Sequence, residues 1–176
     1  YHVPKSEVTK KMRRNAKAVN FGIIYGISSF GLSEDLNIDV KEAKEFIENY
    51  LNTFPGIRDY MKEEIEEAKK LGYSKTLFGR KRYIEELKST NFMIRSMGER
   101  MALNTPIQGT SADILKKAMI EIFNEFKKRN IKSKMIIQVH DELVIDTLVS
   151  EKDEVIKIVK EIMENTYKLN VPLKVD

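Results

Sequence analysis

The chain has 176 residues, a mass of 20.5 kDa and a net charge of +4. A hydrophobic content of 41% with 33% charged residues is typical of a globular fold with a buried core, as one domain or two small lobes. The absence of cysteine excludes disulfides and cysteine-rich zinc sites, and two histidines exclude a histidine-rich metal site. Carboxylates therefore remain as metal ligands. No apolar run approaches the ~18 residues of a membrane helix.

The basic residues concentrate in two zones. Residues 1–20 contain six lysines and arginines against one acid, and residues 69–82 contain six and no acid. Residues 34–67 between them contain eleven acids and four bases. Such a polarised surface, with a pI of about 9.0, suggests a polyanionic partner. Charge alone leaves solvated helix faces as an equal alternative.

The predicted elements are mostly helices, in an order that favours an α+β fold over an alternating parallel sheet. Helices are expected from a Ser6 cap to about Tyr25, from a capping box at Asp39 to about Thr53, from Pro55 to Gly72, from 89–91 to about Arg129 with a bend near Pro106, and after a Ser150 cap. Strands are expected at 73–77 and 82–84 around Gly79, at 135–139 and 143–145, and at 173–175. The stretch 28–37 stays ambiguous. Val155, Ile158, Val159, Ile162 and Met163 share one face of the last helix.

Four residues of the first predicted helix recur at intervals of four: Arg13, Lys17, Phe21 and Tyr25. A helix places all four within a stripe about 120° wide and about 18 Å long. The two cations come first, towards the helix N-terminus, where the macrodipole favours anions. A ligand with phosphates at one end and a sugar and base at the other would match this order.

The alternative is an ordinary amphipathic helix with Phe21 and Tyr25 in the core and the cations in water. Gly22 and Gly26 favour the ligand, because each directly follows one of the aromatic residues and glycine destabilises a helix by roughly 1 kcal/mol. Close approach of a ligand or of another backbone would explain both glycines.

Two β-rich runs enclose His140, Asp141 and Glu142, which indicates a hairpin with a polar tip. Magnesium takes one or two protein carboxylates and completes its octahedron with water and substrate phosphate. A hairpin tip would expose such carboxylates. An ordinary polar turn, with a structural His140, is the alternative for this tripeptide.

Taken together, these segments resemble the family A DNA polymerases, of the bacterial DNA polymerase I type. The matching segments are motif B in 13–26 (RRNAKAVNFGIIYG), a basic turn in 79–82 (GRKR), a long helix in 99–113 (ERMALNTPIQGTSAD) and motif C in 138–143 (QVHDEL). They cover nearly the whole chain in the family's order. The resemblance implies a fingers subdomain in residues 1–89 and part of the palm, with the acidic hairpin, in residues 90–176.

The resemblance also implies roles for single residues. Arg13 and Lys17 would hold the incoming triphosphate, with Lys17 assisting catalysis, Phe21 would lie against the sugar, and Tyr25 would lie near the template base. The residues implied to contact DNA are Tyr25, Gly26, Arg100, Asn104, Gln108 and His140. Asp141 and Glu142 would be catalytic and would bind Mg²⁺, with two ions in the complete site.

The family's motif A, which carries the other metal-binding aspartate in a pattern like Asp-x-Ser-x-x-Glu-Leu-Arg, does not occur here. It would precede Tyr1, and the start Tyr1-His2-Val3 is neither a signal peptide nor an initiator sequence. We therefore expect a fragment that is inactive alone.

The resemblance implies primer-template DNA and deoxynucleoside triphosphates as partners, no membrane, and a monomer that is part of a longer chain. The expected location is the bacterial cytoplasm, at the nucleoid, with an organelle or phage source open. One alternative is a single-subunit RNA polymerase, against which Asn20-Phe21-Gly22 and Glu142 argue. The other is a nucleic-acid-binding module without catalysis.

Overall fold

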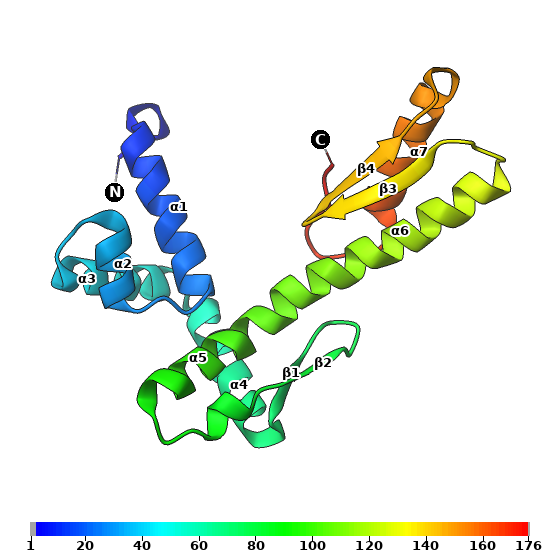
Figure 1. Ribbon diagram of the computed structural model, residues 1–176. Coiled ribbons are helices and arrows are strands. Elements are labelled where there is room, and N and C mark those ends of the chain that lie inside the picture. The colour runs from blue at the N-terminus through cyan, green and yellow to red at the C-terminus, as the bar shows by residue number, and fades with distance from the viewer. Residues whose placement is uncertain (1–2, 176) are drawn as a thin grey trace. The chain divides into compact units, whose positions relative to one another are not determined.

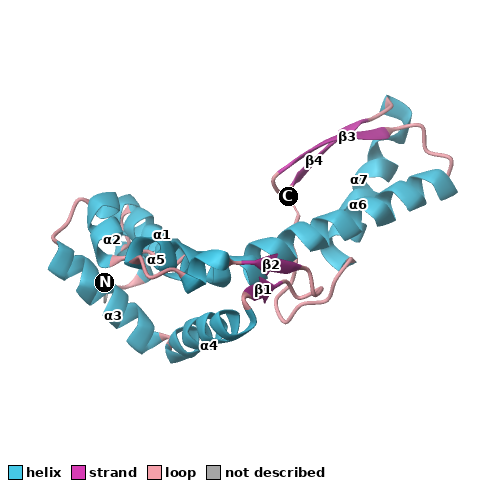
Figure 2. Ribbon diagram, turned by 60° about the horizontal axis from the view of Figure 1, so that its bottom comes forward, coloured by secondary structure: helices cyan, strands magenta, loops and turns pink. Residues whose placement is uncertain are grey.

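The computed structural model describes residues 3–175 and divides into two compact units. Unit 1 comprises Tyr1–Lys75 and Gly79–Pro106, and unit 2 comprises Thr76–Phe78 and Ile107–Asp176. Tyr1 and His2, with which the sequence begins, lie outside the described residues. Each unit combines helices with one two-stranded antiparallel sheet (Figures 1 and 2), which confirms the mostly helical α+β fold.

Unit 1 is built from helices around two small apolar clusters. Its elements are α1 (Lys10–Ile24), α2 (Ser29–Leu36), α3 (Val40–Thr53), α4 (Pro55–Leu71), β1 (Tyr73–Lys75), β2 (Lys81–Tyr83), α5 (Phe92–Asn104) and the 3-10 helices Lys5–Glu7 and Glu85–Lys88. One cluster joins α1, α2 and α3 through Val19, Ile23, Leu32 and Ala43. The other consists of Ala68, Ile84, Leu87 and Ala102.

The helix boundaries of unit 1 follow the predicted signals with one correction. Thr9 caps α1, and its hydroxyl accepts a hydrogen bond from the Met12 backbone N–H at 3.2 Å. Ser6, the predicted cap, lies inside the 3-10 helix Lys5–Glu7 and is followed by extended backbone at Val8. The first extended residue with a capping side chain next to the helix is therefore Thr9.

Other boundaries in unit 1 are confirmed. Asp39 caps α3 by accepting from the Lys41 N–H at 2.7 Å, and Pro55 begins α4. Gly72 ends α4 at a φ of 77°, a left-handed conformation that favours glycine. The ambiguous stretch 28–37 contains α2, which Ser28 caps.

Unit 2 consists of α6 (Thr110–Lys128), β3 (Lys134–Val139), β4 (Glu142–Asp146), a 3-10 helix (Val149–Glu151) and α7 (Lys152–Asn165). Its core joins α6 to the predicted apolar face of α7 through Ile122, Phe126, Val155 and Ile158. The predicted helix around Pro106 is interrupted by a π-helical turn, Thr105–Gly109. Proline has no N–H to donate, so a regular α-helical ladder cannot continue through it.

Two predictions for unit 2 are wrong. Ser150 does not cap α7, because it lies within the 3-10 helix Val149–Glu151 that precedes it. Residues 173–175 form no strand; the Val175 N–H donates instead to the Glu164 carboxylate at 3.3 Å. No helix in the described part of the chain is long and apolar enough to cross a membrane.

Residues Thr76–Phe78, which belong to unit 2 although they precede the rest of it in the chain, contact the start of α6. The Thr76 hydroxyl donates to Asp113 at 2.7 Å, and both residues are buried. The Leu77 N–H donates to the Thr110 hydroxyl at 2.9 Å. A Cβ on Gly109 would lie 2.5 Å from the Thr76 methyl, so glycine allows this close packing.

Candidate functional site

The predicted stripe lies on the exposed side of α1. The helix buries Val19 and Ile23 against α2 and α3, whereas Phe21 is 47% exposed. Arg13 and Lys17 are exposed too. The amphipathic alternative, which placed Phe21 in the core, is therefore wrong for this residue. The exposed ring is therefore accessible to a ligand.

The side chains of the stripe contact one another in series. The Lys17 Nζ atom lies 5.7 Å from the centroid of the Phe21 ring. The Phe21 and Tyr25 rings stack with centroids 6.2 Å apart and planes inclined by 27°. Within residues 3–175, neither Arg13 nor Lys17 forms an ion pair, so both charges are available to an anionic ligand.

Different features of the structure explain the two glycines next to the stripe. Gly26 has a φ of +71°, and a Cβ there would lie 3.0 Å from Cγ of Arg100. A Cβ on Gly22 would lie 2.9 Å from a methyl group of Ile27. Side chains of the protein itself therefore lie close to both glycines. This packing brings together Gly26 and Arg100, both predicted DNA contacts.

The other predicted DNA contacts differ in exposure. Arg100, Gln108 and His140 are exposed. Asn104 is half-buried, and its side-chain oxygen is buried without a hydrogen-bond partner among the described residues. An unpaired buried amide oxygen costs about 1–3 kcal/mol, so this acceptor would gain from a ligand that donates to it.

The predicted acidic hairpin is present. Val139 pairs with Glu142, so His140 and Asp141 form a two-residue turn in which His140 has a φ of 53°. The Gln138 side-chain amide donates to the His140 carbonyl at 2.7 Å and braces the turn from within β3. This bracing role of Gln138 was not predicted from the sequence, in which Gln138 was only part of a motif. A polar residue next to a turn is the signal that could have indicated it.

Asp141 and Glu142 are exposed at the hairpin tip. Neither carboxylate has a side-chain partner in the part of the chain that the structure describes. Both line a cavity of about 590 Å³, together with Ser111 and Ile114 of α6. Carboxylate oxygens are the ligands that magnesium takes from a protein, so these two residues could hold such an ion together with water and substrate phosphate. Among residues 3–175 no third histidine, cysteine or carboxylate joins them in one cluster.

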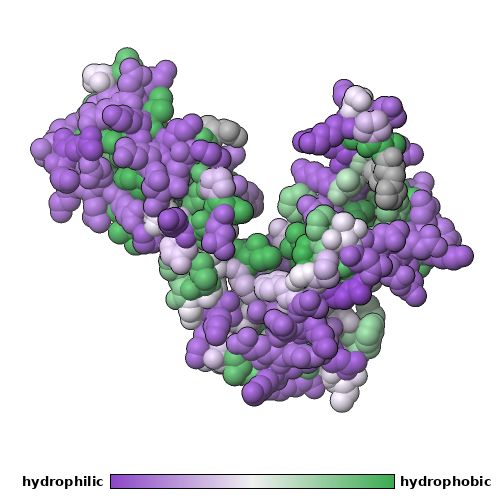
Figure 3. All heavy atoms as spheres, turned by 180° about the vertical axis from the view of Figure 1, so that it is seen from behind, coloured by the Kyte–Doolittle hydropathy of each residue, from purple (hydrophilic) through white to green (hydrophobic). Residues whose placement is uncertain are grey.

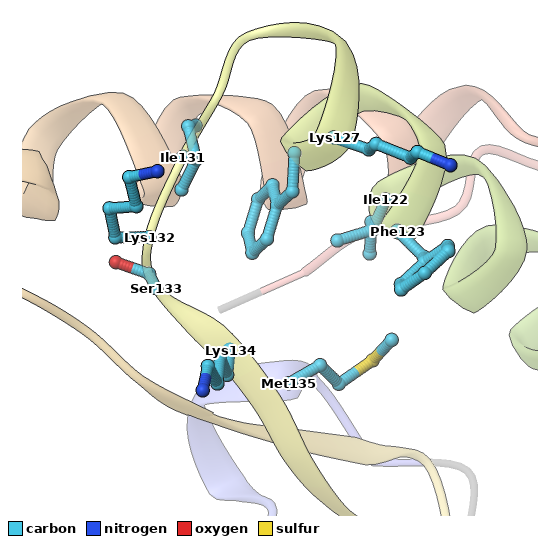
Figure 4. Close-up of a pocket in the computed structure, with 9 residues that line it drawn as sticks. Ile122, Phe123, Lys127, Ile131, Lys132, Ser133, Lys134 and Met135 are labelled. Carbon is cyan, nitrogen blue, oxygen red and sulfur yellow. The ribbon is translucent and has the colours of Figure 1, made fainter.

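A second cavity of about 480 Å³ lies between α6 and β3 (Figure 4). Ile122, Phe123, Ile131 and Met135 form its apolar part, with lysines around them. None of the predicted site residues lines it. Phe123 is 62% exposed. Hydrophobic residues interrupt the mostly hydrophilic surface on the face shown in Figure 3.

Comparisons with known proteins agree with the motifs. Residues 1–176 match the model of DNA polymerase family A, and the chain belongs to this family. DNA polymerase I of Bacillus subtilis (strain 168) is 53% identical over 176 residues, and that of Bacillus caldotenax is 51% identical. The chain spans 20% of the length of each of these curated relatives. A solved structure, the POL domain of Pol1 from M. smegmatis in complex with DNA primer-template and dNTP, is 44% identical with a TM-score of 0.92, over 98% of this chain and 30% of that one.

Proposed function

We propose that this chain forms the nucleotide-binding and metal-binding part of a DNA-directed DNA polymerase that adds deoxynucleotides to a primer 3′ end. The exposed stripe on α1 carries the proposal, because its cations and stacked rings match the order of a nucleoside triphosphate. The relatives support it, since they are DNA polymerases and the solved one is described with DNA primer-template and dNTP. They give no support to an RNA polymerase or to a module without catalysis.

The stripe binds the incoming nucleotide. Arg13 forks onto phosphate oxygens and Lys17 adds a point charge, which together offset the charge that develops on the leaving pyrophosphate. Phe21 packs on the sugar and excludes water from it. Tyr25, stacked on Phe21, lies next to the template base.

The remaining polar residues hold the primer-template. Arg100 and Gln108 are exposed and free to donate, and Asn104 can donate through its side-chain N–H groups. Such contacts can be blind to sequence, because the minor-groove acceptors are similar for all correct base pairs. Gly26 lets the backbone come close to DNA, and His140 seats the primer end.

Asp141 and Glu142 supply the protein ligands for magnesium. Bound there, Mg²⁺ would supply Lewis-acid chemistry, which would make the primer 3′-hydroxyl more acidic and stabilise charge at the α-phosphate. The hairpin carries Asp141 in a two-residue turn braced by Gln138 and Glu142 at the first position of β4, which places both carboxylates side by side at the tip. A further carboxylate from motif A, on a segment outside these 176 residues, completes the two-metal site.

The same proposal assigns the subdomains, the oligomeric state and the cellular location. Residues 1–89 form fingers and residues 90–176 form part of the palm of a monomeric enzyme of DNA replication and repair in the bacterial cytoplasm.

The test is primer extension by a polymerase polypeptide that joins this segment to its motif A strand. We expect template-dependent use of deoxynucleotides in preference to ribonucleotides, lost in Asp141→Ala while duplex DNA is still bound. The 176-residue chain alone should not extend a primer. Salt-sensitive DNA binding with no effect of Asp141→Ala on any activity would instead indicate a binding module.

A further inference from the structure

One hydrogen bond ties the side of the α1 stripe to a neighbouring helix. The phenol O–H of Tyr50, on α3, donates to the side-chain oxygen of Asn20, on α1, at 2.5 Å. Thirty residues separate the two in the chain. Asn20 lies three residues after Lys17 on the same helix, so the bond lies at the border of the stripe.

The Tyr50 ring is itself held in place. It packs against the apolar cluster of α1, α2 and α3, and it contacts the Phe54 ring with centroids 5.0 Å apart. Tyr50 therefore presents its hydroxyl from a fixed position. The side-chain oxygen of Asn20 accepts this hydrogen bond, which ties the exposed side of α1 to α3.

The other contacts of α1 with its neighbours fix the rotation of the helix about its axis less well than this hydrogen bond does. The helix buries only Val19 and Ile23. Apolar burial is not directional, so two buried side chains constrain the rotation of the helix about its axis less than a directional hydrogen bond does. Side-chain tips lie about 5–6 Å from the axis, so a roll of about 20° would move the Phe21 ring and the Lys17 amine by about 2 Å. A displacement of about 1 Å can already impair a reaction severely.

We propose that Tyr50 is a positioning residue, whose hydrogen bond to Asn20 fixes the roll of α1 and so aligns the phosphate-binding and sugar-binding side chains of the stripe. This inference rests on the proposed function for its consequence, but the tether itself is a physical claim about α1. Tyr50 does not touch the nucleotide in this account; it acts through Asn20.

The experiment compares Tyr50→Phe, Asn20→Ala and the double variant in the polymerase that contains this segment. Tyr60→Phe, which removes a phenol hydroxyl from α4 of the same unit, is the matched control. We expect Tyr50→Phe to lower kcat/KM for deoxynucleotides roughly three- to tenfold, because the side chains of the stripe are then less well aligned with the nucleotide. The affinity for primer-template and the melting temperature should stay at the level of the Tyr60→Phe control.

The double variant tests whether the two residues act through one bond. The losses of the single variants should not multiply, because either change already removes the interaction. Hydrogen exchange of the α1 amides gives a readout independent of activity, and it should be faster in Tyr50→Phe than in Tyr60→Phe.

Three results would overturn the proposal: nucleotide kinetics in Tyr50→Phe equal to those of the control, losses that multiply in the double variant, or DNA affinity and melting temperature that fall in parallel with nucleotide use. An unaltered polymerase that does not use deoxynucleotides would refute the proposed function instead. The exchange measurement then decides on the tether alone: unchanged α1 exchange in Tyr50→Phe refutes it, and faster exchange supports it.

Discussion

Lys17→Ala separates the stripe from the rest of the α1 helix most cleanly. Lys17 is exposed and forms no ion pair within the described part of the chain, so the substitution breaks no internal salt bridge. It removes the cation over the Phe21 ring, an exposed contact worth about 0.5–1 kcal/mol. Alanine is the best helix former and regains a few tenths of that. The expected loss of stability is therefore below about 1 kcal/mol.

The expected loss of nucleotide use is larger. A hydrogen bond to a charged group contributes about 1.5–3 kcal/mol, or about 10- to 150-fold in kcat/KM. Steady-state incorporation of a single deoxynucleotide, with primer-template saturating, measures this loss. Duplex DNA affinity in the same variant should fall far less, because the stripe binds the nucleotide rather than the duplex.

Lys44→Ala is the control for charge. It removes one lysine from α3 of the same unit, where the ammonium group pairs with Glu48 at 3.8 Å and is largely exposed. Such a surface pair contributes little, and Lys44 is not in the stripe. Equal kinetics in Lys17→Ala and in the unaltered enzyme would refute the stripe, and equal losses in Lys17→Ala and Lys44→Ala would reduce the effect to net charge.

Three further outcomes are expected. Phe21→Tyr should raise the ratio of dideoxy- to deoxynucleotide incorporation about tenfold, because its hydroxyl could replace the hydrogen bond lost with the 3′-hydroxyl; an unchanged ratio would remove Phe21 from the sugar. Glu151→Gln should lower the melting temperature at pH 7, and the difference should shrink below pH 4.5. Hydrogen bonds from Ser133 and the Lys132 backbone lower the Glu151 pKa from 4.5, so its stabilisation is lost as pH falls through the folded pKa. Gly26→Ala should destabilise by about 1–2 kcal/mol, lowering the melting temperature by about 2–8 °C, because alanine is strained at a φ of +71°; Gly56→Ala, in open space, should not.

Features that depend only on neighbouring residues in the chain were predictable from the sequence. The stripe repeats every four residues, and the hairpin shows as two β-rich runs around three polar residues, so local geometry alone places both. The wrong cap at Ser6 also has a local origin. Ser6 and Thr9 are both good capping residues, and only the 3-10 turn between Pro4 and Val8 decides in favour of Thr9.

Features that depend on distant residues were not predictable. Nothing in the sequence near Asn20 points to Tyr50, thirty residues away, because the folding of α3 against α1 creates their contact. Residues 173–175 have an apolar pattern that suits a strand, but a strand also needs a neighbour for its backbone hydrogen bonds. Val175 finds the carboxylate of Glu164 instead. Tertiary context overrides propensity at such positions.

In each half of the proposed site, the residues that stabilise the fold and the residues proposed to bind ligands lie on different parts of one element. In α1 the supporting face buries Ile23, which is 2% exposed, while the opposite face exposes the Phe21 ring. In the hairpin, Leu143 and Ile145 pack towards the core of α6 and α7, while Asp141 projects from the tip. A buried isoleucine contributes about 2–5 kcal/mol against truncation, whereas an exposed carboxylate without a partner contributes almost nothing to folding. Loss of activity on changing Ile23 would therefore report unfolding, and loss of activity on changing Phe21 or Asp141 reports the chemistry itself.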